Sequence, residues 1–77
     1  MTDKEKAKIQ MLVIIDLLED GKEHRNATQM VESSTIELKN EVLNVYYVDG
    51  YCSTYLYKDN KIKFLYMTKE SQKWKNY

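Results

Sequence analysis

The stretch that decides the fold is residues 51–67, YCSTYLYKDNKIKFLYM. Aromatic and aliphatic residues dominate both sides of Asp59-Asn60, which predicts two strands, at about residues 51–57 and 62–67, joined by a tight turn. Asp and Asn both tolerate the positive φ that a two-residue hairpin turn requires. We therefore predict a β-hairpin in this part of the chain.

The turn also fixes which residues face each other across the hairpin. Lys58 should lie directly opposite Lys61, and like charges across a strand pair are destabilising unless an anion such as a phosphate lies nearby. One side of the hairpin should be almost wholly aromatic and pack on a core. The expected pairs are Tyr57 with Ile62, Tyr55 with Phe64, and Ser53 with Tyr66.

Capping sequences predict three helices before the hairpin. A hydrogen-bonding cap precedes Glu or Gln by three residues in TDKE (2–5), NATQ (26–29) and STIE (34–37). We expect helices at about residues 3–20, 27–33 and 35–47, the first closed by Gly21 and the third by Asp49-Gly50. The apolar faces are Ile9, Leu12, Val13 and Leu17, then Ala27, Met30 and Val31, then Leu38, Val42, Val45 and Tyr46.

Thr68 is a good cap for a fourth helix at about residues 69–76, which is amphipathic only through Trp74 and Tyr77. Such a helix folds only if it docks on something. We expect Trp74 and Tyr77 to form a dimer contact, because a small core gains stability from a second subunit. Docking of the same helix on its own core is the alternative.

Composition predicts one domain over residues 1–77, with no linker and a small core. The single cysteine, Cys52, excludes a disulfide within the chain, and one His with one Cys is too few for a usual zinc cluster. No leader or membrane-spanning run is evident, so we expect a cytoplasmic protein without membrane contact. No cofactor, metal or catalytic constellation is expected, and we expect that the protein is not an enzyme.

Charge is unevenly distributed although the chain has no formal net charge at pH 7. Residues 1–49 carry six basic and ten acidic side chains, whereas residues 50–77 carry six basic and two acidic ones. Any affinity for phosphate should therefore be concentrated in the hairpin and the residues after it.

The order of helices and strands resembles that of the winged helix-turn-helix family of DNA-binding regulators. Residues 14–21 (IIDLLEDG) resemble the end of the first helix of that family, and residues 27–31 (ATQMV) resemble its second. Residues 48–51 (VDGY) resemble the passage into the wing, and residues 64–70 (FLYMTKE) the exit from it. The resemblance implies an α+β winged-helix fold with three helices, a two-stranded wing at 51–67 and a short C-terminal helix.

The same resemblance implies a dimeric transcription regulator that binds double-stranded DNA at a short operator. Helix 35–47 would then enter the major groove, and the wing would contact the backbone or minor groove. Asn can pair with adenine, and lysines can neutralise phosphates. The implied DNA contacts are Thr35, Lys39, Asn40 and Asn44 on the helix, and Arg25, Lys58, Lys61 and Lys63 in the loop and wing.

A second hypothesis from another class stays open. The same fold could be a protein-interaction module or inhibitor that does not bind DNA, because the acidic pair Glu37 and Glu41 could dock on a basic partner. The composition, rich in Lys, Asn, Tyr and Ile and free of Pro, also suits an accessory protein of a virus or plasmid.

Overall fold

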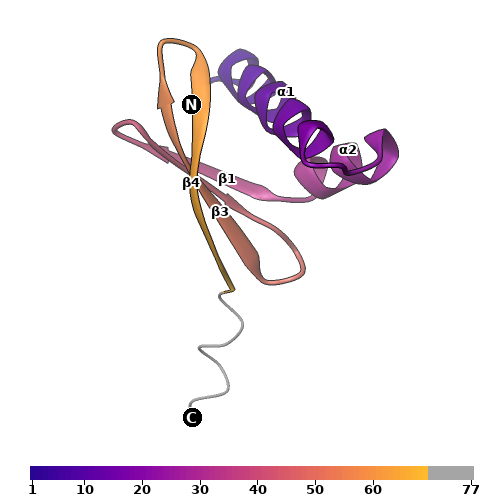
Figure 1. Cartoon of the computed structure of the whole chain (residues 1–77). Coiled ribbons are helices and arrows are strands. Elements are labelled where there is room, and N and C mark those ends of the chain that lie inside the picture. Colours follow the sequence, from indigo (N-terminus) through magenta and orange to yellow (C-terminus); the bar gives the residue numbers. More distant parts are fainter. Residues whose placement is uncertain (70–77) are drawn as a thin grey trace.

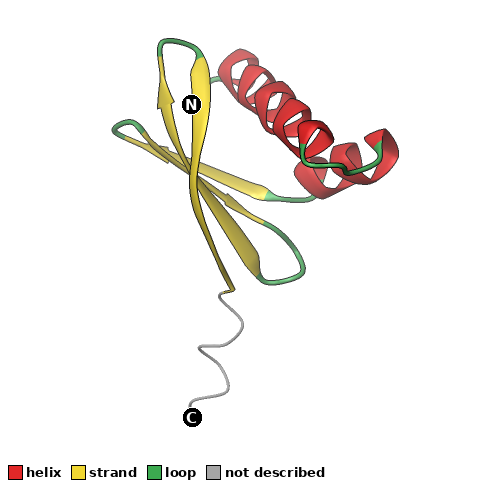
Figure 2. Cartoon of the chain, viewed as in Figure 1, coloured by secondary structure: helices red, strands yellow, loops and turns green. Residues whose placement is uncertain are grey.

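Two helices lie on one face of a four-stranded antiparallel sheet in the computed structural model, which describes residues 1–69 (Figure 1). The strands pair in the order β1-β2-β3-β4, so each strand lies beside its neighbour in sequence. The colours of Figure 1 show that the helices come first along the chain, and Figure 2 distinguishes them from the twisted sheet that follows. The expected α+β class is thus retained, but the winged-helix architecture with three helices before a two-stranded wing is wrong.

Helix α1 (Asp3–Glu19) begins at the predicted cap, where the Glu5 amide donates to the Thr2 hydroxyl oxygen at 3.1 Å. It ends just before Gly21, whose φ of 95° suits glycine better than any other residue. Three residues of the predicted apolar stripe are buried: Ile9, Val13 and Leu17. The first helix and its inward face are therefore confirmed.

Helix α2 (His24–Glu32) begins three residues before the predicted start. Asn26, the predicted cap, therefore lies inside the helix. Glu23 occupies the cap position but makes no side-chain capping bond. At the other end, the hydroxyls of Ser33 and Ser34 donate to the carbonyls of Gln29 (2.7 Å) and Val31 (2.6 Å), respectively. Ser34 therefore closes α2. The STIE sequence had indicated that Ser34 would start a third helix, which does not form.

The predicted helix at 35–47 is instead the hairpin of β1 (Thr35–Lys39) and β2 (Val42–Tyr46). Burial alternates along both strands, and Leu38 pairs with Leu43. The strands turn at Asn40, which has a φ of 50°. Side chains of a strand alternate between its two sides, so only one side of each strand faces the helices. The predicted helical face had combined residues from both sides of these strands.

The predicted C-terminal hairpin is confirmed as β3 (Tyr51–Lys58) and β4 (Lys61–Lys69). Both turn residues have positive φ, 54° at Asp59 and 62° at Asn60. The expected pairs Tyr57 with Ile62, Tyr55 with Phe64, and Lys58 with Lys61 are all present.

One expected pair in this hairpin is wrong, because Ser53 pairs with Met67 and not with Tyr66. Leu65 is an extra residue between Phe64 and Tyr66 and shifts the register by one, which is a β-bulge. β4 also continues to Lys69, so Thr68 does not cap a helix. The remainder of the expected fourth helix, with Trp74 and Tyr77, lies outside the described residues.

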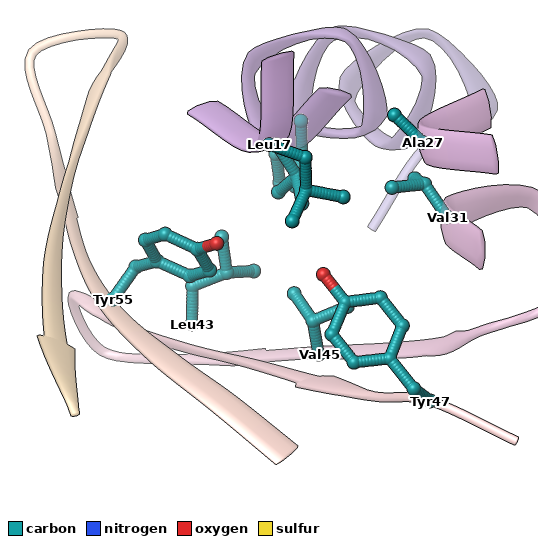
Figure 3. Close-up of a cluster of buried hydrophobic side chains, with 9 residues drawn as sticks. Leu17, Ala27, Val31, Leu43, Val45, Tyr47 and Tyr55 are labelled. Atoms are coloured by element: carbon teal, nitrogen blue, oxygen red, sulfur yellow. The ribbon is translucent and has the colours of Figure 1, made fainter. Parts of the chain in front are cut away.

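The core lies between the helices and one face of the sheet (Figure 3). Leu43, Val45, Tyr47 and Tyr55 rise from the sheet toward α1 and α2, and the two phenol oxygens point into this layer. Burying one such aliphatic side chain contributes about 1.5–3 kcal/mol. Within residues 1–69, no helix covers the opposite face of the sheet.

Candidate functional site

Strand β4 is one edge of the sheet within the described residues, so its outer backbone groups have no strand partner there. It spans nine residues. Four consecutive large apolar side chains of β4 are about half exposed: Phe64 (47%), Leu65 (45%), Tyr66 (55%) and Met67 (49%). A long edge strand with apolar side chains is a surface on which another strand can pair.

The bulge at Leu65 distributes these side chains over both faces of the edge. Phe64 and Met67 pair with Tyr55 and Ser53, so they lie on the helix side of the sheet, whereas Tyr66 pairs with Thr54 on the open side. The Phe64 ring packs edge-on against Tyr55, with ring centroids 5.6 Å apart and planes at 74°.

The lysines of the hairpin give the same edge a positive charge. Lys61 and Lys63 pair with Lys58 and Leu56, which places them together on the open side of the sheet. They alternate with Ile62 and Phe64, and β4 contains no acidic residue. At its far end, the Lys69 ammonium lies 4.7 Å from the centre of the Tyr51 ring, a cation–π contact.

A buried polar cluster anchors the strand next to β4. The Tyr55 hydroxyl donates to a carboxylate oxygen of Asp16 on α1 at 3.0 Å. Burial raises the pKa of Tyr55 above its ordinary value, with Tyr47 and Asp16 adding to the rise. Burial likewise raises the pKa of Tyr47. Both phenols therefore stay protonated near neutral pH, and the cluster holds β3 on α1.

Two hydroxyl groups in this cluster have no hydrogen-bond partner among the described residues, those of Tyr47 and Ser53. The Ser53 hydroxyl lies near both phenols and partly offsets the rise in their pKa, but its contacts lack the geometry of a hydrogen bond. Ser53 also lines a cavity of about 170 Å³ behind β4. Its other lining residues are Asp16, Leu17, Asp20, Tyr55, Phe64 and Met67.

The structure scatters the residues expected on a DNA-reading helix. Thr35, Glu37 and Lys39 lie on β1, at the sheet edge opposite β4. Asn40 and Glu41 form the turn after β1, and Asn44 lies on β2. The Asn44 amide oxygen accepts a hydrogen bond from the Thr54 hydroxyl at 2.7 Å, so it is engaged within the sheet.

The expected wing lysines, unlike the residues of the expected DNA-reading helix, do lie together. Lys58, Lys61 and Lys63 are on one hairpin. Arg25 is exposed in the first turn of α2. The sequence interpretation missed the exposure of residues 64–67, since it placed Phe64 and Tyr66 on the core. The signal that could have found them is an apolar run that is flanked by lysines and interrupts the alternation of a strand.

No group of three or more His, Cys, Asp or Glu side chains in residues 1–69 could hold a metal ion. Cys52 is buried, and its thiol donates to the Asn44 amide oxygen at 4.0 Å. In the same part of the chain, neither helix is long and apolar enough to cross a membrane. Comparison of the chain with protein-family models, curated proteins and solved structures finds no match.

Proposed function

We propose that this protein is a protein-interaction module in which β4 captures an extended segment of a partner protein by strand addition. The observation that carries the proposal is the run of four half-exposed apolar side chains on a nine-residue edge strand. In strand addition, main-chain hydrogen bonds supply affinity and the alternating side chains supply specificity.

The side chains of β4 define the chemistry of the partner. Lys61 and Lys63 lie on the open side of the sheet, whereas Ile62 and Phe64 lie on the helix side. An added strand presents alternate residues to the same two sides. The best partner therefore alternates acidic residues, next to the lysines, with aliphatic residues next to Ile62 and Phe64.

Two other occupants of this edge are disfavoured by its charge and shape. Pairing of β4 with a second copy of itself would bring two sets of lysines together without an acidic residue on either strand. Duplex DNA suits Lys58, Lys61 and Lys63, but it gives no role to the apolar side chains beside them. The helix expected to read bases is absent, since residues 35–39 and 42–46 form the strands β1 and β2.

The test is binding of a fluorescent, end-blocked peptide of about eight residues with alternating Val and Glu, followed by anisotropy. We expect a Kd on the order of 10–100 µM that weakens with salt. The double variant Lys61→Glu, Lys63→Glu should lose most of this binding and should instead bind the matching Val–Lys peptide. Lys39→Glu, which removes an exposed lysine from the other edge strand, is the matched control and should bind the Val–Glu peptide normally.

A mixed-sequence DNA duplex is the competing probe in the same assay. Tight, steeply salt-dependent binding of DNA that is lost in the double lysine variant, without peptide binding, would overturn the proposal. It would assign the lysines of the hairpin to phosphate contacts instead. Equal affinity of the wild-type protein for the Val–Glu and Val–Lys peptides would also contradict it.

A further inference from the structure

Helix α1 carries a second apolar stripe on the side that faces away from the sheet. Met11 is 64% exposed and Ile15 is 46% exposed, although Ile9, Val13 and Leu17 on the inward side are buried. The stripe continues into a shallow groove of about 400 Å³ beside α2, which Ala7, Ile14 and Leu18 also line. A helix that is apolar on two sides has a second surface to bury.

The charges of α1 are distributed unevenly along its length. Lys4 and Lys8 lie in its first half, whereas Glu19 lies in its last turn and Asp20 follows it. That last turn contains no basic residue. Acidic side chains there are repelled by the partial negative charge of the helix C-terminus. A positive group from another molecule would therefore stabilise this end.

We propose that a second copy of the chain covers this stripe, with the two α1 helices packed antiparallel. In an α-helix each residue advances 1.5 Å and turns by 100°. A two-fold axis midway between Met11 and Ile15 therefore packs each Met11 against the Ile15 of the other copy. The same axis packs the small Ala7 against Leu18, so that a small residue meets a large one.

The antiparallel arrangement also pairs the charges. Lys8 and Glu19 lie on the same flank of the stripe and at nearly equal distances from the two-fold axis. Each Lys8 then meets the Glu19 of the other copy, and the acidic end of each helix receives a positive charge. Within one helix these two residues are eleven positions, or about 16 Å, apart, so they cannot pair with each other.

This interface is separate from the strand-addition surface and does not rest on it. Met11 and Ile15 lie on the side of α1 opposite the buried residues Ile9, Val13 and Leu17, so the β4 edge of each copy stays free in the dimer. The stripe is narrow, and we expect a Kd on the order of 10–100 µM, typical of small interfaces.

The test is sedimentation equilibrium of the full chain over a concentration series spanning that range. The wild-type protein should shift from monomer to dimer, and Ile15→Lys should weaken association at least about tenfold. Leu65→Lys is the matched control, because Leu65 has the same exposure on β4, and it should dimerise normally. Circular dichroism checks that each variant folds.

Charge exchange tests the register of the helices. Lys8→Glu and Glu19→Lys should each weaken the dimer severalfold, and the double variant should restore it, because the exchanged charges again meet across the axis. A monomeric wild-type protein throughout the series would overturn the proposal. So would a dimer that tolerates Ile15→Lys but is lost with Leu65→Lys, since β4 would then be the interface.

Discussion

The two edges of the sheet differ in length, charge and exposed surface. β1 is five residues long, and its exposed positions include the oppositely charged Glu37 and Lys39. β4 is nine residues long, is basic, and exposes Phe64 and its three neighbours. Short, charged edge strands resist pairing with other chains, whereas long apolar ones invite it. β1 therefore resists pairing with another chain, whereas β4 keeps a long apolar edge.

Both edges depend on the two inner strands, which supply the buried core. Leu43 and Val45 of β2 are fully buried, and so is Tyr55 of β3. Tyr55 also joins β3 to α1 through Asp16. Leu65, by contrast, has no partner on β3 and is 45% exposed, so substitutions there can separate folding from binding.

The largest expected effect sharpens this separation. Tyr55→Ala should lower the free energy of unfolding by about 3–5 kcal/mol, because it leaves a cavity and removes the bond to Asp16. Leu65→Ala, on the exposed edge next to it, should change stability by less than about 0.5 kcal/mol. Urea denaturation measures both. A large loss of stability with Leu65→Ala would show that the exposed part of β4 belongs to the core.

The second-largest expected effect is a loss of stability of the folded protein at alkaline pH. The pKa values of Tyr47 and Tyr55 are raised in the folded state, so the unfolded chain, with phenol pKa values of about 10, loses these protons first. Their stabilising contribution is complete below about pH 10 and is lost as the pH rises further. Urea denaturation at a series of pH values should show this decline.

Removal of one phenol isolates the cause of that decline. Tyr55→Phe should be less stable at neutral pH, by about 1–3 kcal/mol for the bond to Asp16, but should decline less steeply in alkali. Tyr47→Phe is the matched control, because its hydroxyl has no hydrogen-bond partner among residues 1–69, and it should be neutral or slightly stabilising at pH 7. If the free energy of unfolding fell with pH in both variants as steeply as in the wild type, the two phenols would not be the cause of the alkaline decline.

The smallest expected effect concerns the bulge. Deletion of Leu65 should preserve every other pair of the β3–β4 hairpin, since Leu65 has no partner on β3. A regular strand is flatter than a bulged one and pairs more readily along its edge. We therefore expect stability within about 1 kcal/mol of the wild type and severalfold tighter binding of the Val–Glu peptide. Weaker binding would mean that the bulge itself shapes the site.

Sequence reasoning predicted the parts of the fold that local signals determine. The Thr2 cap and Gly21 delimit α1, and the two positive-φ residues of the Asp59-Asn60 turn set the hairpin register. These signals act within a few residues, so a single sequence contains them in full.

The errors arose where two periodicities compete. Residues 35–47 contain apolar residues at both helical and strand spacing, and the Asn40-Glu41 turn is weaker than an Asn-Gly pair. Pairing of β2 with β3 decides the outcome, and that contact is not local. The lysines of the site were predicted on the hairpin, but the exposure of residues 64–67 depends on which strand forms the edge, and local sequence does not specify it.

Amide hydrogen exchange distinguishes the two edges, because β4, and not β1, should accept a partner strand. Two-residue turns leave the amides of Ile62 and Phe64 on β4, and of Ile36 and Leu38 on β1, pointing away from their neighbours. With the Val–Glu peptide at about ten times its Kd, Ile62 and Phe64 should exchange roughly tenfold more slowly, with Ile36 and Leu38 unchanged. Equal protection of both edges, or none at β4, would exclude strand addition at β4.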